Sequence, residues 1–143
     1  MKIAFVLLMM ACGVSVSVVM LRESAKKVRR ARTLFELSEF IEERIRLSAT
    51  PLPAIIERFN ASRGDKESAV TLSCLTESED PEIRRLTDGI CRLDVRGALA
   101  TASLLKNYTE REMQRVTDEA SRGGRVMMVL PPAACLLISL LLI

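Results

Sequence analysis

Carboxylates are the side chains of this sequence whose types and spacing best suit chemistry. Glu42 and Glu43 are adjacent, and Glu77, Glu79 and Asp80 form a second acidic group, so either set could bind a divalent cation weakly. The sequence contains no histidine, which is the commonest general base and metal ligand in proteins. A solvated acidic surface is the more ordinary explanation. We therefore expect no catalytic residue, no metal and no cofactor.

The cysteines and the single tyrosine add no reactive site to these acids. Cys12, Cys74, Cys91 and Cys135 have no CxxC spacing, which excludes a typical zinc site, and they are expected to be small buried hydrophobic residues. A Cys74–Cys91 disulfide is the alternative if the middle of the chain is exported. Tyr108 is expected to pack along a helix with its hydroxyl in water. Since the sequence also lacks a GxxxxGK[ST] phosphate-binding loop, we expect that the protein is not an enzyme.

A block of basic residues is the strongest charge feature of the chain. Six basic residues, opposed only by Glu23, follow one another closely: Arg22, Lys26, Lys27, Arg29, Arg30 and Arg32. A nucleic-acid patch is one interpretation, but aromatic residues that could stack on bases make up only 3% of the chain. The block directly follows an apolar segment, and a basic residue near an anionic membrane surface gains about 1 kcal/mol. We expect contact with anionic lipid headgroups and no nucleic-acid partner.

Two uncharged segments, at 3–21 and 126–143, flank the charged middle of the chain. As a helix, the second segment would reach about 27 Å, close to the thickness of the hydrocarbon core of a bilayer. We therefore predict an N-terminal and a C-terminal transmembrane helix. A cleaved signal peptide is the alternative for the first segment, but its apolar run continues past Gly13 to Leu21, which favours an uncleaved anchor. Because basic residues next to a membrane segment stay inside the cell, residues 22–125 are predicted to be cytoplasmic.

Residues 22–125 are enough for one domain with its own core, and their apolar spacing is helical. Leu34, Leu37, Ile41 and Ile45 form one stripe, and no glycine or proline lies between Val14 and Thr50, so we predict that the first membrane helix continues into this stripe. Thr50-Pro51-Leu52-Pro53 ends it at positions 49–50. There Thr50 is predicted to cap a second helix with Pro51 at its first position. Leu52, Ile55, Ile56 and Phe59 are expected to form the apolar face of that helix.

The remaining signals complete an all-α fold of five or six helices in a membrane-anchored bundle. Asp65 is predicted to cap a third helix that carries Val70, Leu72, Cys74 and Leu75, and Asp80-Pro81 to start a fourth. Ile83, Leu86, Ile90 and Leu93 are expected to face inward from the fourth helix, which Gly89 is expected to break. Asp94 is expected to start a long last helix through Ala120. Gly123-Gly124 is predicted to form a hinge, and Pro131-Pro132 a kink.

The order of these features resembles the stage III sporulation protein AB family. The resemblance rests on the apolar anchor with its basic exit, the amphipathic helix that leads into Thr50-Pro51-Leu52-Pro53, the Leu86–Asp94 stretch, and a long helix that runs into an apolar C-terminus. The region around 62–80 is shorter than the family pattern, and the two glycines and two prolines near the end depart from it. The resemblance implies a helical domain like the cytoplasmic domains of the type II secretion F protein.

The resemblance also implies a function and a place. The protein would be a non-enzymatic membrane platform or adaptor of a secretion-like channel complex in sporulation. It would act at the mother-cell membrane around the forespore and dock a separate cytoplasmic ATPase and other membrane proteins of the complex. A small helical-hairpin membrane protein of another class, holin-like or an envelope stress factor, is the alternative. The residues expected to contact a partner or lipid are Arg22, Lys26, Lys27, Arg29, Arg30, Arg32, Thr50, Pro51, Leu52 and Pro53.

Overall fold

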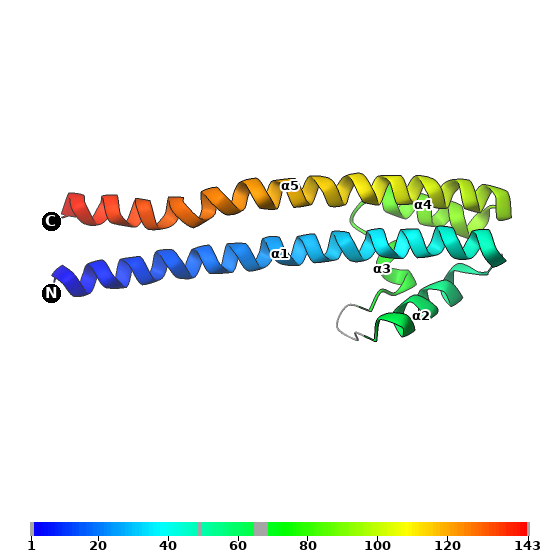
Figure 1. The fold of residues 1–143 in the computed structure, drawn as a ribbon, viewed down its shortest axis with the longest axis horizontal. Coiled ribbons are helices and arrows are strands. Elements are labelled where there is room, and N and C mark those ends of the chain that lie inside the picture. Colours follow the sequence, from blue (N-terminus) through cyan, green and yellow to red (C-terminus); the bar gives the residue numbers. More distant parts are fainter. Residues whose placement is uncertain (1, 49, 65–68, 143) are drawn as a thin grey trace. The chain divides into compact units, whose positions relative to one another are not determined.

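The described part of the chain is entirely helical. The computed structural model describes residues 2–48, 50–64 and 69–142, with the backbone alone at 2–6, 9, 127–128, 132 and 139–142. Those residues form five helices: α1 (Lys2–Ser48), α2 (Leu52–Arg63), α3 (Leu72–Thr76), α4 (Pro81–Arg92) and α5 (Val95–Leu142) (Figure 1). No strand occurs among them, so the predicted all-α class is confirmed.

The helices group into two units. Unit 1 contains Met1–Arg30 and Gln114–Ile143, and unit 2 contains Ala31–Met113. The long helices α1 and α5 contribute to both units, whereas α2, α3 and α4 belong to unit 2 alone. These boundaries lie inside the charged middle of the sequence and do not follow the hydropathy boundaries at 21 and 126. Within the part of the chain that is described, no helix is long and apolar enough to cross a membrane.

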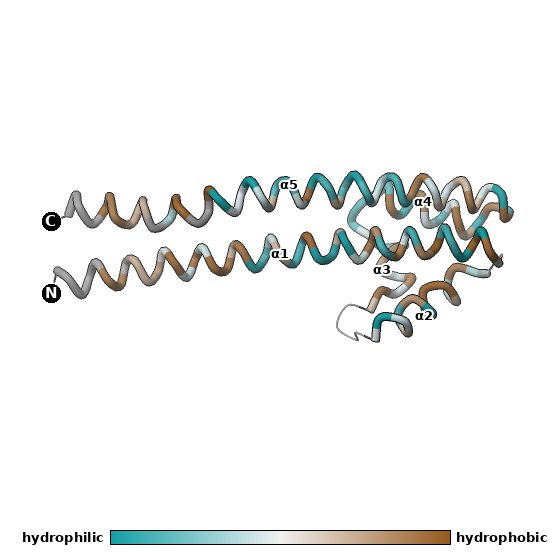
Figure 2. Tube along the Cα trace, viewed as in Figure 1, coloured by the Kyte–Doolittle hydropathy of each residue, from teal (hydrophilic) through white to brown (hydrophobic). Residues whose placement is uncertain are grey.

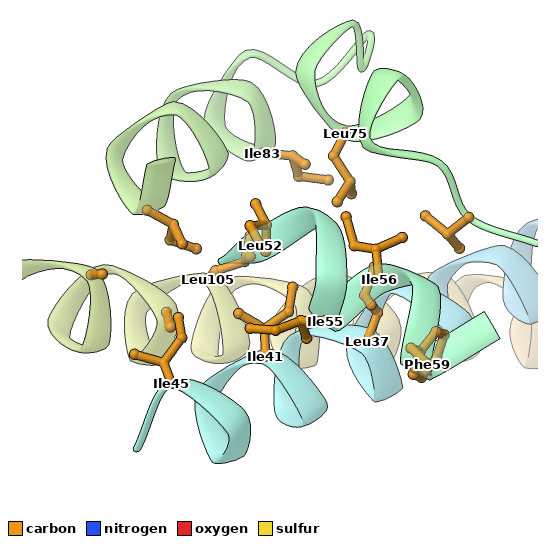
Figure 3. Close-up of a cluster of buried hydrophobic side chains, with 14 residues drawn as sticks. Leu37, Ile41, Ile45, Leu52, Ile55, Ile56, Phe59, Leu75, Ile83 and Leu105 are labelled. Atoms are coloured by element: carbon orange, nitrogen blue, oxygen red, sulfur yellow. The ribbon is translucent and has the colours of Figure 1, made fainter. Parts of the chain in front are cut away.

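Unit 2 is held together by aliphatic side chains that come from all five helices. Leu37, Ile41 and Ile45 of α1 are buried, as are the four residues of the predicted face of α2: Leu52, Ile55, Ile56 and Phe59. Leu75, Ile83 and Leu105 complete the cluster from α3, α4 and α5 (Figure 3). The spacing of three and four residues puts these side chains on one face of each helix. The predicted apolar stripes of α1 and α2 are therefore confirmed.

The first helix is continuous and ends at Ser48, as expected because no glycine or proline lies between Gly13 and Pro51. The start of α2 differs from the prediction. Its N-cap is Pro51, in an extended conformation, and Pro53 lies in its first turn. Thr50 does not cap it, because the Thr50 hydroxyl turns back to the Ser48 carbonyl oxygen at 2.5 Å. The helix ends at Gly64, whose φ of 63° is the left-handed conformation that glycine adopts most easily.

The third helix is shorter than predicted. It spans only Leu72–Thr76 and begins after Thr71, so Val70 lies outside it, and the proposed cap Asp65 lies outside the described residues. Val70 is instead fixed by Asn60, whose side-chain amide donates to the Val70 carbonyl oxygen at 2.6 Å and accepts from the Val70 N–H at 3.0 Å. This pair of hydrogen bonds fixes the two ends of the segment that connects α2 to α3.

The fourth helix starts as predicted but continues through Gly89. The Asp80 carboxylate accepts a hydrogen bond from the Glu82 N–H at 3.0 Å, with Pro81 in the first turn. The prediction of a break at Gly89 is wrong, because α4 is a single helix from Pro81 to Arg92. A methyl group at Gly89 would lie 3.1 Å from Thr101 Cγ2 of α5. Glycine thus permits α4 and α5 to approach closely. Leu93 ends the helix and is 51% exposed, so it does not face inward as expected.

The fifth helix begins after Asp94, whose carboxylate accepts from the Gly97 N–H at 3.1 Å. It continues past Ala120 and passes through Gly123-Gly124 and Pro131-Pro132 as one helix to Leu142. The helix is therefore continuous through the glycine pair at which a hinge was predicted. A glycine inside a helix costs about 1 kcal/mol and does not by itself end the helix.

Unit 1 pairs the start of α1 with the end of α5. A methyl group at Gly13 would lie 3.0 Å from Cys135 Sγ and 3.6 Å from the Pro131 carbonyl oxygen, and one at Gly124 would lie 3.8 Å from Leu21 Cδ2. Since higher numbers on α1 meet lower numbers on α5, the two segments run antiparallel. Small residues, Gly13 and Gly124, lie at these contacts, as in closely packed helix pairs.

Candidate functional site

The predicted basic block lies on the exposed surface of α1. Arg22, Lys26, Lys27, Arg29, Arg30 and Arg32 are all exposed. Arg32 pairs with Glu36 at 3.2 Å, and Glu36 also pairs with Arg63 of α2 at 3.5 Å. No ion pair joins Arg22, Lys26, Lys27 or Arg30 to another described residue. Arg32 therefore belongs to the ion pairs of unit 2, while Arg22, Lys26, Lys27 and Arg30 remain available to an anion.

The Thr50–Pro53 corner is only partly a surface. Leu52 is 5% exposed and packs in the core, so its side chain cannot contact a partner. Pro51 and Pro53 are exposed, and the Thr50 hydroxyl lies 2.7 Å from the Ser48 hydroxyl. The corner thus contributes two proline rings and one threonine to the surface of unit 2.

Exposed aliphatic side chains gather at the same end of unit 2 as this corner. Leu47 in the last turn of α1 is 69% exposed, and Leu93 and Val95, on either side of Asp94, are 51% and 53% exposed. The end of α1 and the start of α5 both lie at this end of unit 2 (Figure 1). We call Leu47, Pro51, Pro53, Leu93 and Val95 the bundle end. Sequence reasoning missed Leu93 and Val95, although aliphatic residues on both sides of a capping aspartate are a visible signal.

Basic residues border the bundle end. Arg46 and Arg96 are exposed, and no ion pair joins either of them to another described residue. Arg92 is also exposed and pairs with Asp88 at 3.0 Å. Asp94, the nearest carboxylate in sequence, is occupied as the cap of α5. An apolar surface with this border suits a partner that presents aliphatic and acidic side chains.

Tyr108 forms a link between α5 and the start of α4 that the sequence did not indicate. Its hydroxyl donates to the Asp80 carboxylate at 2.6 Å, while the other oxygen of that carboxylate caps α4. This hydrogen bond, followed by burial and by the Asp80 charge, raises the pKa of Tyr108 from 10.0 to about 12. The expectation of a hydroxyl in water is therefore wrong. The residue therefore joins α5 to the start of α4.

Of the two predicted acidic groups, Glu42 and Asp80 form contacts between or at the ends of helices, while Glu43, Glu77 and Glu79 do not appear in an ion pair between described residues. Glu42 and Glu39 of α1 pair with Lys106 of α5 at 3.2 Å and 3.6 Å. The hydrogen bond with Glu42 and the charge of that carboxylate raise the pKa of Lys106 above its ordinary value of 10.5. Among the described residues, no three histidine, cysteine, aspartate or glutamate side chains are arranged to hold a metal ion.

The cysteines are all free thiols, and Cys74 and Cys91 are exposed and unbonded to each other. The expectation of buried cysteines is therefore wrong for these two residues and for Cys12, which is also exposed. Partial burial, and next the charge of Asp88, raise the pKa of the Cys91 thiol above 9.0.

A small hollow inside unit 2 is lined mainly by aliphatic side chains, and its two hydroxyls, on Ser38 and Thr109, lie 2.8 Å apart in a hydrogen bond. It has the chemistry of a gap in a core.

Unit 1 exposes its large apolar residues, whereas unit 2 buries them. Gly13 and Ser17 face inward, and the Ser17 hydroxyl donates to the Gly13 carbonyl oxygen at 3.1 Å. Large aliphatic side chains are exposed on both helices: Leu7, Leu8, Val14, Val16, Val18, Val19 and Met20 of α1, and Val126, Val129, Leu130, Leu136, Leu137 and Ile138 of α5. Each large aliphatic side chain left in water forgoes about 1.5–3 kcal/mol of burial energy.

Comparison of the chain with protein-family models, curated proteins and solved structures finds no match. The resemblance to the stage III sporulation protein AB family, and the channel complex and ATPase that it implies, therefore stay predictions.

Proposed function

We propose that this protein is a non-enzymatic membrane platform or adaptor that holds a cytoplasmic partner protein at a bacterial membrane. Segments 3–21 and 126–143 anchor the chain, and unit 2 presents the docking surface. The observation that carries the proposal is the reversal of apolar side chains between the units. Unit 2 buries its aliphatic residues as a water-soluble domain does, whereas unit 1 buries small residues and exposes large aliphatic ones.

The exposed aliphatic side chains of unit 1 support an anchor because a monomer in water rarely leaves so many of them uncovered. Charge supports the orientation, since the basic residues lie between the apolar segments and unit 2 in the sequence. Unit 2 has an aliphatic core that is complete in itself, which a simple pore-forming hairpin would not need. This favours an adaptor over the holin-like alternative.

The docking surface that we propose is the bundle end. Its exposed leucine and valine side chains, bordered by Arg46 and Arg96, would bind a partner surface with aliphatic and acidic groups. By the family resemblance, the partner is a P-loop ATPase encoded as a separate chain, and the complex belongs to a sporulation channel. The site would act by binding alone.

The orientation can be tested with the protein's own cysteines. Cys74 and Cys91 are exposed on unit 2 and report its location, while Cys12 and Cys135 are replaced by serine. A membrane-impermeant maleimide added to intact cells should label the protein only after permeabilisation. Labelling of intact cells would place unit 2 outside the cytoplasm and reject the proposal.

Docking can be tested at the bundle end with an internal control. Leu47→Glu together with Leu93→Glu should weaken binding of a candidate P-loop ATPase at least tenfold, because two aliphatic contacts are lost and two like charges meet an acidic partner. Leu104→Glu is the matched control, since Leu104 is 58% exposed on α5 and lies about 13 Å along the helix from Val95. Equal binding by both variants would exclude the bundle end.

A further inference from the structure

Along both helices of unit 1 the exposed residues change from aliphatic to basic. Packing of α1 against α5 places the two changes side by side, at the same level along the helix pair. On α1 the exposed aliphatic residues end at Met20, and Arg22 follows; on α5 they begin at Val126, and Arg125 precedes them. Figure 2 shows the change along each helix from hydrophobic to hydrophilic residues. The contact of Leu21 with Gly124 lies at this change on both helices. The sequence places the two changes about a hundred residues apart, and only the antiparallel register aligns them.

The basic side chains at this level point away from the helix contact. The inward stripe of α1 passes through Gly13, Ser17 and Leu21, and none of the basic residues falls on it. Arg22, Lys26, Lys27 and Arg30 of α1 and Arg122 and Arg125 of α5 are all exposed, and we call these six residues the basic collar. They lie on the exposed surface of both helices, in the segments that follow the aliphatic one on α1 and precede it on α5.

The charge at this level is strongly unbalanced. Residues 22–30 and 114–125 contain eight basic and three acidic side chains. The acids are Glu23, Asp118 and Glu119, and Glu119 pairs with Arg115 at 3.6 Å. A net positive surface therefore lies at the boundary of an apolar one. A bilayer that contains anionic phospholipid has the complementary arrangement, with acyl chains below phosphate groups.

We propose that the basic collar binds the headgroups of anionic phospholipids and sets the depth at which unit 1 sits in the bilayer. The inference rests on the proposed function, because it requires the hairpin to be in a membrane, and it adds the lipid class and the residues that select it. Arginine and lysine of the collar contact phosphate oxygens, while the exposed aliphatic side chains of unit 1 named above contact acyl chains.

Lipid selection can be measured with the full chain reconstituted in phosphatidylcholine vesicles. Trace spin-labelled phosphatidylglycerol or spin-labelled phosphatidylcholine is added, and electron paramagnetic resonance gives the fraction of each that the protein immobilises. The wild-type protein should associate with phosphatidylglycerol several-fold more strongly than with phosphatidylcholine. High salt should reduce the preference, because it screens exposed charges.

Substitutions in the collar provide the decisive comparison. Arg22→Gln, Lys26→Gln and Arg122→Gln together should remove most of the several-fold phosphatidylglycerol preference, because three of the six collar charges that would contact phosphate are lost. Arg84→Gln, Arg85→Gln and Arg96→Gln, exposed residues of unit 2, form the matched control and should leave the preference unchanged. Equal immobilisation of both lipids by the wild-type protein, or the same preference in the collar variant, would overturn the proposal.

A separate measurement distinguishes failure of the collar from failure of the anchor. If the full chain does not float with vesicles of either composition, the membrane anchor of the proposed function is wrong, and with it the collar. If it floats with both but shows no lipid preference, only the collar is wrong. The register itself is checked by Gly13→Cys with the native Cys135 in a background without the other cysteines. A disulfide should form on mild oxidation, because a Cβ at position 13 would lie 3.0 Å from Cys135 Sγ.

Discussion

The hydrogen bond between Tyr108 and Asp80 can be tested almost without interference from the rest of the protein. Tyr108 is the only tyrosine and the chain has no tryptophan, so phenolate absorbance reports this side chain alone. In the folded protein the titration midpoint should lie at about 12 instead of 10.0. Unfolding in denaturant, or Asp80→Asn, should return it toward 10.0, because the hydrogen bond to a charged acceptor is the largest cause of the shift.

The same shift has a consequence for stability. Because the folded protein raises the pKa of Tyr108, the stabilisation is complete below pH 10.0 and is lost as the pH rises to about 12. The two values set an upper limit of about 2.7 kcal/mol. Tyr108 is half-buried, so water competes for the hydroxyl, and we expect Tyr108→Phe to lower the free energy of unfolding by about 1 kcal/mol at neutral pH.

The measurement is denaturant unfolding of the full chain, followed by circular dichroism at neutral pH and at pH values from 10.0 to about 12. The difference between wild type and Tyr108→Phe should shrink across that range. Asp80→Asn serves as the partner in a double-mutant cycle, since the amide oxygen still caps α4. A midpoint near 10.0 in the folded protein, or a variant as stable as wild type, would refute the reasoning.

Two further predictions concern unit 2. Leu105→Ala should lower the free energy of unfolding by about 2–5 kcal/mol, because Leu105 is 3% exposed, whereas Leu104→Ala should change it by less than about 0.5 kcal/mol; equal effects in denaturant unfolding would contradict the assigned core. Alkylation of Cys91, followed by mass spectrometry, should show a midpoint above pH 9.0 that Asp88→Asn lowers, since the Asp88 charge opposes the thiolate; an unshifted midpoint would show that neither burial nor Asp88 acts on it.

Periodicity predicted the elements of unit 2 well where one helix face is continuous. The stripe of Leu37, Ile41 and Ile45 and the face of α2 were both recognisable, because burial on one side imposes a spacing of three and four residues. The cap at Asp80 was recognisable for the same local reason, since an aspartate before proline satisfies a free N–H at the helix start.

The errors arose where partners distant in the sequence decide the structure. Gly89 looked like a break, but the close approach of Thr101 gives it a packing role that no local pattern reveals. Tyr108 finds its acceptor 28 residues away, and the bundle end combines the last turn of α1 with the first residue of α5. Thr50 was predicted as a cap on residue type alone, whereas its hydroxyl found a nearer acceptor at Ser48.

The two hydrogen bonds between Asn60 and Val70 make the chain between them a place where length can change. The Asn60 side-chain amide already joins α2 to the residue before Thr71, the N-cap of α3, so we expect the core to keep α2 and α3 in the same positions when this connection is lengthened. Loop-closure entropy rises by only about 0.6 kcal/mol when a loop doubles in length. A peptide tag or a fluorophore acceptor sequence inserted after Gly64, the C-cap of α2, should therefore leave the fold intact.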